Sequence, residues 1–314
     1  MKLLILGAGG IGGLFGGRLA QTGADVTFLV REKRKAQLAS DGLRIESQFG
    51  NACLPVQARL QSEIEPRYDL VLLTCKAYDL PSAVQAIRPA MSPTTAVLPL
   101  LNGIAHIETL NAEFGKQRVM GGTARVQVTL TPDGLIKQLN DWQTVTFGEQ
   151  DGSTSDRAAT LKALLDKTVV EAKLSGNIMR ELWLKLVHLS TVAGMTCLMR
   201  GNLGEIIRTP EGSDLLIKFF EANAEIAARA GHRPDDKFVN TYRDLFQQRD
   251  SRYEASMLRD LEKGGQIESE QILGFMLRQC RAAGLPDALH LAAYTHAKTF
   301  EQRRDAGRLP RPQA

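Results

Sequence analysis

Short apolar runs alternate with amphipathic segments along the first half of the chain. Residues 2–6 and 26–30 are almost wholly apolar, as is typical of strands buried on both faces of a sheet. The segment 10–22 between them has the apolar spacing of a helix. Further strands are expected at 69–77 and 94–103. This alternation predicts a doubly wound α/β domain with a parallel sheet.

The pattern changes in the middle of the chain. Residues 126–138 alternate around a Pro-Asp-Gly turn and predict a β-hairpin, which the strand 142–149 follows. We expect these antiparallel strands to close the sheet. From residue 175 the apolar spacing is helical. The sequence therefore predicts an α/β domain over residues 1–174 and an all-α domain over residues 175–314.

Six helices are expected in the second domain. Their predicted ranges are 177–200, 209–230, 236–248, 253–263, 269–283 and 286–306. The second of these should begin at Thr209, which precedes a proline and an acidic residue and has the side chain of a helix N-cap.

A glycine-rich turn joins the first strand to the first helix. The sequence GAGGIG, which starts at Gly7, matches G-x-G-x-x-G. In this motif Gly7 permits the tight turn, Gly9 lets the backbone approach a pyrophosphate, and Gly12 lets the helix pack on the strand. N–H groups at the helix start, where Gly10 and Ile11 lie, would bind the phosphates. The complete βαβ context favours a Rossmann-type dinucleotide-binding domain over a turn without a ligand.

The residue after the second strand bears on the choice of cofactor. NAD-binding units usually carry Asp or Glu there to bind the ribose 2′-OH. This chain has Arg31, followed by basic residues at 33–35. A guanidinium suits a 2′-phosphate, so we predict NADP(H) over NAD(H). Two alternatives stay open: these residues form a solvated helix start, or Glu32 pairs with Arg31.

Two polar residues stand near the ends of later expected strands. Lys76 lies at the end of 69–77, and Asn102 at the end of 94–103. Parallel sheets bind ligands at the carboxyl ends of their strands. Both residues are therefore candidates for binding the nicotinamide end of the cofactor and the substrate. The alternatives are a surface lysine and a turn asparagine in Asn-Gly.

Several motifs spread over nearly the whole chain belong together. They are GAGGIG, TCKAY, LLNG, GGT, RELWLKL, SMLRDLEKGGQIESE and the LPRP tail. The RELWLKL and SMLRDLE segments are the more specific ones. With these motifs the chain resembles the ketopantoate reductases (2-dehydropantoate 2-reductases), which are NADPH-dependent enzymes of pantothenate biosynthesis.

The resemblance implies roles for three residues of the helical domain. Lys185 matches the catalytic acid, Glu268 a second essential polar group that also holds the ribose or a substrate hydroxyl, and Ser256 a substrate-binding serine. Reduction of a 2-oxo acid needs a hydride and a proton, and a lysine on an apolar helix can supply the proton because such surroundings lower its pKa. The alternatives are a lysine that snorkels to solvent, a solvated glutamate and an ordinary helical serine.

The chain departs from the family at three substrate-binding asparagines. Leu189 and Ala193 stand four and eight residues after Lys185, and Leu273 replaces the third asparagine. His188 is a candidate substitute for one of these contacts. Ketopantoate is the predicted substrate. A paralogous reductase of a more apolar 2-oxo acid or ketone, and a non-catalytic NADP(H)-binding sensor, are the alternatives.

Composition excludes several other classes of protein. Of the 314 residues 43% are apolar and 24% charged, which is ordinary for a globular chain with two cores. A net charge of +4 with 6% aromatic residues argues against nucleic-acid binding. The four cysteines show no metal-binding spacing, and no apolar run suits a signal peptide or a membrane span. We expect a cytoplasmic enzyme without a metal, with a small-molecule 2-oxo acid as its partner; a homodimer is possible.

Overall fold

The computed structural model describes residues 1–309, so the LPRP motif lies partly outside it. By its contacts the chain forms two units. The first comprises Met1–Leu101 and His106–Glu181, and the second comprises Asn102–Ala105 and the chain from Leu182 onward. Each unit is described by itself.

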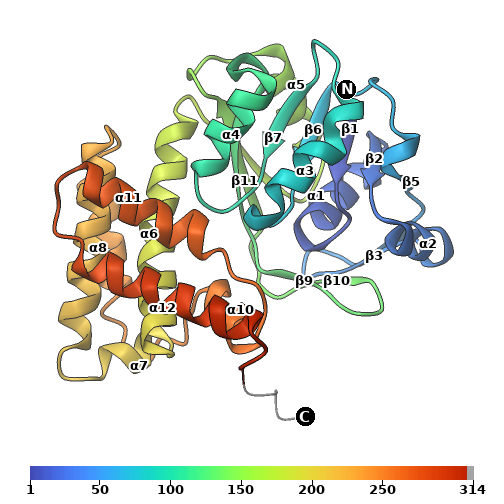
Figure 1. Cartoon of the computed structure of the whole chain (residues 1–314). Helices are drawn as coiled ribbons and strands as arrows, with labels where there is room; N and C mark the ends of the chain where they lie inside the picture. Colours follow the sequence, from blue (N-terminus) through green and yellow to red (C-terminus); the bar gives the residue numbers. More distant parts are fainter. Residues whose placement is uncertain (310–314) are drawn as a thin grey trace. The chain divides into compact units, whose positions relative to one another are not determined.

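The first unit is built on a parallel five-stranded sheet (Figure 1). Its strands are, in sheet order, β5 (Gln57–Arg59), β2 (Asp25–Leu29), β1 (Lys2–Leu6), β6 (Leu70–Leu73) and β7 (Ala96–Pro99). Every pairing in this sheet is parallel, which confirms the predicted doubly wound class. β6 and β7 each end four residues before the predicted ranges 69–77 and 94–103 do.

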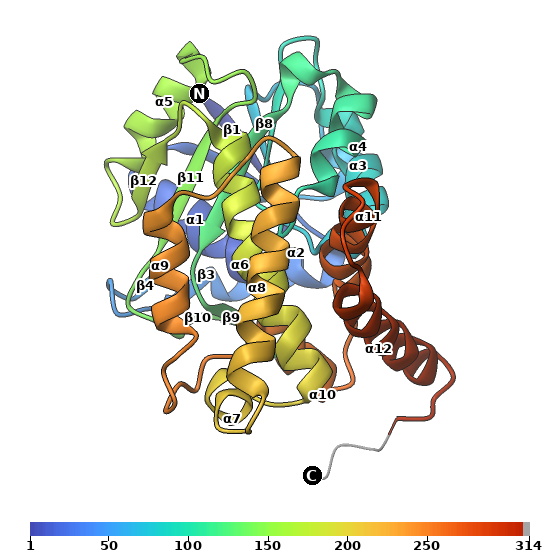
Figure 2. The ribbon, with the colours of Figure 1, turned by 90° about the vertical axis from the view of Figure 1, so that its left-hand side faces the viewer.

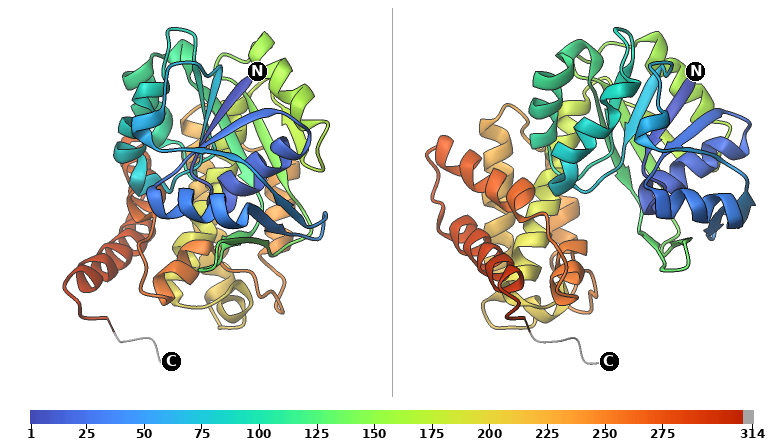
Figure 3. Two further views of the ribbon diagram at one scale, coloured as in Figure 1. Left: turned by 90° about the vertical axis from the view of Figure 1, so that its right-hand side faces the viewer. Right: turned by 45° about the vertical axis from the view of Figure 1, so that its right-hand side comes forward.

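Helices cover both faces of this sheet. Leu3 and Ile5 of β1 join one core with apolar residues of α1 (Gly10–Gln21) and α5 (Asp156–Leu165). Figures 1 and 3 show α3 (Leu80–Ile87) and α4 (Ala105–Phe114) on the opposite side of the strands. The remaining helices are α2 (Glu32–Asp41) and the 3₁₀ turns η1 (Gln61–Glu63), η2 (Ala77–Asp79), η3 (Arg88–Ala90) and η4 (Lys116–Arg118).

The antiparallel strands form two further sheets. The predicted hairpin is confirmed as β9 (Val128–Leu130) and β10 (Leu135–Gln138). β10 pairs in parallel with β3 (Leu43–Glu46), which pairs in turn with β4 (Ala52–Leu54). β8 (Met120–Arg125), β11 (Thr144–Glu149) and β12 (Glu171–Leu174) form the other sheet.

The expectation that these strands close the parallel sheet is wrong for the hairpin, whereas an isolated parallel bridge between Val97 of β7 and Val119 links the parallel sheet to the start of β8, the partner of β11. The hairpin packs on helix α1 instead, where two glycines leave room for it. A Cβ on Gly10 would lie 3.1 Å from Val128 Cγ1, and one on Gly13 only 2.3 Å from Ile136 Cδ1.

The second unit is helical throughout its described residues. Its helices are α6 (Ile178–Met199, which begins in the first unit), α7 (Leu203–Ile207), α8 (Gly212–Arg229), α9 (Asp236–Leu245), α10 (Ser256–Glu262), the π-helix η5 (Glu270–Gly274), α11 (Phe275–Ala282) and α12 (Ala288–Asp305). Helices α6 and α8 lie side by side (Figure 2), and Ser190 Oγ of α6 donates to Asn223 Oδ1 of α8 at 2.9 Å. The predicted fold class, α/β followed by all-α, is confirmed.

Three details of the helical prediction differ from the structure. Thr209 caps no helix; its hydroxyl donates to the Ile206 carbonyl at the end of α7, and α8 begins only at Gly212. Helix α7 was not predicted, although Asn202 and Glu205 form the capping box that marks its start. The expected helix 269–283 opens with the π-helix η5 rather than an α-helical turn.

Helix α6 is the one helix in the described part of the chain that is long and apolar enough to cross a membrane, with a mean hydropathy of 1.4. The residues of its most apolar window are 72% buried inside the protein. Val187 and Ala193, for example, are completely covered. The apolar character of α6 is therefore satisfied by its neighbours within the fold.

A buried polar cluster in the helical unit should make its stability depend on pH. His290 of α12 is 3% exposed, its Nε2 lies 3.2 Å from Asn223 Oδ1, and its Nδ1 has no partner. Burial lowers the pKa of His290 to about 4. Protonation therefore favours the unfolded chain, so this contribution is complete above the unfolded pKa near 6.5 and is lost as the pH falls towards 4.

We predict that His290 alone removes about 3 kcal/mol of unfolding free energy between pH 7 and pH 4. Denaturant unfolding at a series of pH values measures this loss. His290→Gln, which keeps hydrogen-bonding groups but does not titrate, should show a smaller loss over the same range. Equal losses in both proteins would show that His290 does not titrate on unfolding.

Candidate active site

The glycine turn of the first unit has the geometry that its motif predicts. Gly7 adopts φ +91°, a conformation that side chains other than glycine rarely accept. A Cβ on Gly12 would lie 2.3 Å from the Gly7 carbonyl oxygen, so only glycine lets α1 pack this closely. No atom lies within 4 Å of a Cβ built on Gly9. The backbone at Gly9 is therefore open to a ligand, while Gly10 and Ile11 form the first turn of α1.

Thr74 supports this turn and was missed in the sequence reading. Its hydroxyl donates to the Leu6 carbonyl at 2.8 Å, and its Oγ1 would lie 2.4 Å from a Cβ on Gly12. The TCKAY motif, which begins at Thr74, was the available signal. Thr74 thus joins the ends of β1 and β6 beneath the glycine turn.

Arg31 lies directly before α2, as its N-cap residue, and is exposed. Within residues 1–309 the structure shows no ion pair between Arg31 and Glu32, which was one alternative for this position. The neighbouring Lys35 is engaged elsewhere, since its Nζ lies 2.5 Å from Glu63 Oε1. Arg31 is thus exposed and lies just after the second strand, the place from which folds of this kind usually contact the ribose 2′ position. Its contact with a 2′-phosphate stays a prediction.

Lys76 and Asn102 occupy matching positions. Lys76 follows the last residue of β6, Leu73, by three positions, and Asn102 follows the last residue of β7, Pro99, by three. Leu73 and Pro99 are register partners in the sheet. Lys76 is half-buried and precedes η2. Asn102 belongs by its contacts to the second unit.

Asn102 is hydrogen-bonded to Glu268 in the second unit. Its Nδ2 donates to Glu268 Oε2 at 3.2 Å, and Glu268 is only 4% exposed. The alternative of a solvated glutamate is therefore excluded. Gly103 has φ +81°, and a Cβ there would lie 3.0 Å from the Gln271 carbonyl oxygen. The Asn102-Gly103 pair thus docks closely on the segment that carries Glu268.

Lys185 lies on the less buried face of α6. It is half-buried, as are His188 and Leu189, which share its face three and four positions later. The residues on either side, Leu184 and Leu186, are buried. The helix therefore carries an accessible stripe on this face, which runs from the exposed Glu181 through Lys185 to His188 and Leu189.

The three positions that depart from the family differ in burial. Leu189 lies on the accessible stripe of α6, whereas Ala193 is 0% and Leu273 2% exposed. Ala193 and Leu273 belong to the apolar core of the helical unit. Leu189 is the departure best placed to meet a substrate.

His188 is packed among aromatic side chains. Its ring stacks on Tyr242 with centroids 4.5 Å apart, and its Nε2 lies 3.2 Å from Tyr253 Oη. Ser256, the first residue of α10, follows Tyr253 by three positions and is half-buried. The His188–Tyr253 pair links the segment before Ser256 to the helix of Lys185. That His188 and Ser256 bind a substrate stays a prediction.

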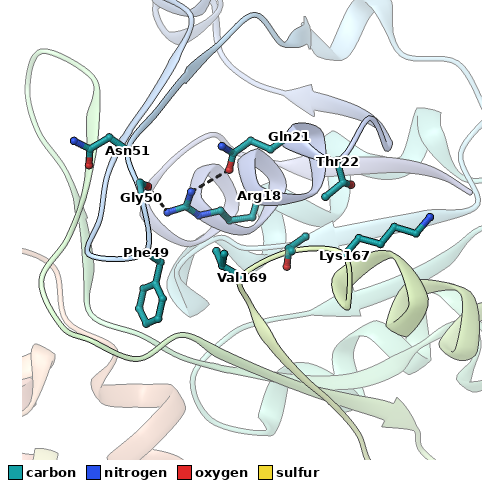
Figure 4. Close-up of a pocket in the computed structure, with 9 residues that line it drawn as sticks. Arg18, Gln21, Thr22, Phe49, Gly50, Asn51, Lys167 and Val169 are labelled. Carbon is teal, nitrogen blue, oxygen red and sulfur yellow. Dashed lines mark hydrogen bonds between the residues drawn. The ribbon is translucent and has the colours of Figure 1, made fainter.

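A cavity of about 340 Å³ elsewhere in the first unit contains none of the predicted site residues (Figure 4). Arg18, which is 3% exposed, donates there to the Gly50 carbonyl at 2.8 Å and to Gln21 Oε1 at 3.0 Å. Burial lowers the pKa of Arg18. These bonds tie α1 to the β3–β4 turn, which explains the arginine structurally.

Family models match both halves of the chain. "Ketopantoate reductase PanE/ApbA" matches residues 3–152, and "Ketopantoate reductase PanE/ApbA C terminal" matches residues 177–301. The chain belongs to the ketopantoate reductase family. It is thus an oxidoreductase, and its family binds 2-oxo acids and a nicotinamide cofactor.

Individual relatives differ in what is known of them. The "uncharacterized oxidoreductase YkpB" of Bacillus subtilis is 31% identical over 302 residues, which cover 96% of this chain and 99% of that protein. The 2-dehydropantoate 2-reductase structure from Methylococcus capsulatus has a TM-score of 0.86 and 26% identity, over 97% of this chain and 98% of that one. D-Mandelate dehydrogenase with NADH and anilino(oxo)acetate shares the fold, with a TM-score of 0.85 and 23% identity, over 97% of this chain and 100% of that one.

The second and third glycines of the motif should respond differently to substitution. We predict that Gly9→Ala leaves the melting temperature nearly unchanged, because the added methyl group meets open space, but weakens cofactor binding at least about tenfold because it occupies the approach to the backbone. Gly12→Ala should lower the melting temperature by several degrees, because its methyl group collides with backbone. Thermal unfolding and calorimetric titration with NADPH measure both effects. A stable Gly12→Ala protein, or a Gly9→Ala protein with normal affinity, would contradict this assignment.

Proposed function

We propose that this protein reduces a 2-oxo acid with NADPH, that 2-dehydropantoate is its substrate, and that Lys185 is the general acid. The position of Lys185 carries the proposal: a half-buried lysine lies on the accessible stripe of a largely buried helix. A rigid helix and apolar neighbours suit proton donation near neutral pH. The predicted 2-oxo acid becomes a 2-hydroxy acid.

The residues divide the work of the reaction between them. When bound, the reduced nicotinamide supplies a hydride to the carbonyl carbon of the substrate. Lys185 gives a proton to the carbonyl oxygen and stabilises the charge that develops on it. Ser256 binds the substrate carboxylate. Glu268, held by Asn102, accepts hydrogen bonds from a ribose or substrate hydroxyl.

The first unit offers a fitting cradle for the cofactor. The open backbone at Gly9 and the start of α1 suit a pyrophosphate. Lys76, placed after β6, would contact the nicotinamide end. The exposed Arg31 favours a 2′-phosphate and hence NADPH, although D-mandelate dehydrogenase, which shares the fold, binds NADH.

A more apolar 2-oxo acid is the second candidate substrate. Leu189 lies on the stripe of Lys185 where the family resemblance places an asparagine. Anilino(oxo)acetate, the compound bound to D-mandelate dehydrogenase, is an aromatic 2-oxo acid derivative. A site that lacks a hydrogen-bonding group discriminates weakly for a substrate hydroxyl.

The four cysteines form no disulfide, in keeping with the predicted cytoplasmic location.

Replacement of the proposed acid should separate catalysis from cofactor binding. We predict that Lys185→Ala lowers kcat at least about 100-fold, because general acid catalysis contributes that much, while the Kd for NADPH changes little. Steady-state kinetics and calorimetry measure the two quantities. Lys218→Ala, which removes an exposed lysine of α8, is the matched control.

A sensor without turnover would behave otherwise. In that case the wild-type protein would bind NADPH but show no rate for Lys185→Ala to lower. A Lys185→Ala enzyme with the wild-type kcat would exclude Lys185 as the acid and leave the family assignment intact.

Leu189 should determine which substrate is preferred. We predict that Leu189→Asn raises kcat/KM for ketopantoate relative to an apolar 2-oxo acid by about tenfold or more, because the amide can bind the substrate hydroxyl. The ratio of the two kcat/KM values is the measurement. A ratio that does not move would show that Leu189 lies away from the substrate.

A further inference from the structure

Arg34 of α2 makes contacts that its neighbours in the basic run do not. Its Nε donates to the carbonyl of Ala8, inside the glycine turn, at 3.1 Å. Its Nη1 donates to the carbonyl of Gly134 at 3.1 Å and to Gln37 Oε1 at 2.6 Å. One guanidinium thus joins the glycine turn, helix α2 and the turn of the β9–β10 hairpin.

The hairpin is closely fitted where Arg34 reaches it. Gly134 has φ +84°, and a Cβ there would lie 2.2 Å from Gln37 Nε2. At the other end of the same hairpin, Val128 lies against Gly10 of α1. The hairpin therefore packs on α1 at Val128 and on α2 at Gly134. Arg34 links the same hairpin to the glycine turn.

The charge of Arg34 is only partly compensated. It is half-buried, and no carboxylate lies within ion-pairing distance among the described residues. Its Nη2 is buried without a hydrogen-bond partner. Burial is the main cause that lowers the pKa of Arg34; Arg44 adds to this lowering and Asp41 opposes it. Placing a cation here is unfavourable, which indicates that the contact with Ala8 has a purpose beyond stability.

We propose that Arg34 is a positioning residue for the cofactor, which fixes the Ala8 carbonyl so that the N–H group of Gly9 is aimed at the pyrophosphate. A carbonyl that is held by a donor fixes the orientation of the N–H group in the same peptide unit, which here belongs to Gly9, because the peptide unit is planar. The inference rests on the proposed function, since it needs a dinucleotide at this turn.

This role has a signature that differs from that of Arg31. The pyrophosphate is common to NADPH and NADH, so loss of Arg34 weakens both. The 2′-phosphate is present in NADPH alone, so loss of Arg31 weakens NADPH selectively. The ratio of the two dissociation constants therefore separates the two arginines.

The test compares three glutamine variants by calorimetric titration with NADPH and with NADH. We expect Arg34→Gln to raise both Kd values by the same factor, about tenfold or more, since a charge-assisted bond is lost. Arg31→Gln should raise only the NADPH value. Arg44→Gln is the matched control, because Arg44 Nη2 bonds to Asp133 of the same hairpin turn at 2.9 Å. Within residues 1–309 Arg44 makes no hydrogen bond to the glycine turn, so both Kd values should stay near wild type.

Arg34→Lys provides a second variant should the glutamine protein fold poorly. Lysine keeps the charge but cannot span the three acceptors as a planar fork, so both Kd values should again rise together. Melting temperatures show whether each variant is folded.

Three results would overturn the inference. Unchanged affinities in both Arg34 variants would leave Arg34 with a structural role only. A loss confined to NADPH would make it a ligand of the 2′-phosphate, and an equal loss in Arg44→Gln would assign the effect to the hairpin. Failure of the proposed function is distinct from these, because the wild-type protein would then either bind neither nucleotide or bind NADPH without oxidising it in the presence of a 2-oxo acid.

Discussion

The hydrogen bond between Asn102 and Glu268 is the interaction on which the candidate site depends. A carboxylate that is 4% exposed needs donors, and the Asn102 amide, at 3.2 Å, is one. The bond requires the chain to turn sharply just after β7, which Gly103 permits with its positive φ and its close approach to Gln271. Residues 102–103 are thereby fixed against the segment that carries Glu268. The π-helix that starts at Glu270 is a departure from regular structure at the same place, as is frequent at functional sites.

Helix α6 carries a charged residue, Lys185, within an apolar sequence. The burial pattern explains this charge, because Lys185 lies on the accessible stripe of the helix, together with His188 and Leu189. The His188 ring stacks on Tyr242 and Tyr253, and these contacts fix the orientation of this face of the helix. Stability and chemistry thus use different faces of one helix, and a substitution on the stripe can change specificity without disturbing the core.

The sequence was most informative where one physical requirement dominates. Fully buried strands, the glycine turn and the long apolar helix each follow from local pattern, and the family motifs located Lys185 and Glu268. The pairing of the hairpin with β3 could not be predicted, because it depends on the absent side chains of Gly10 and Gly13, which act across the fold. The Asn102–Glu268 bond joins residues 166 positions apart. Arg34 looked like one of four basic residues, and only its contacts distinguish it from Arg31.

The most direct test of the central claim is the absorbance of NADPH mixed with the purified protein and ketopantoate, followed beside a panel of more apolar 2-oxo acids. If the protein reduces 2-oxo acids, NADPH is lost steadily and an equal amount of the 2-hydroxy acid forms. The acid that is reduced with the highest kcat/KM then identifies the substrate class. If the protein binds NADPH but oxidises it with none of these acids, the proposed reduction of 2-oxo acids is contradicted.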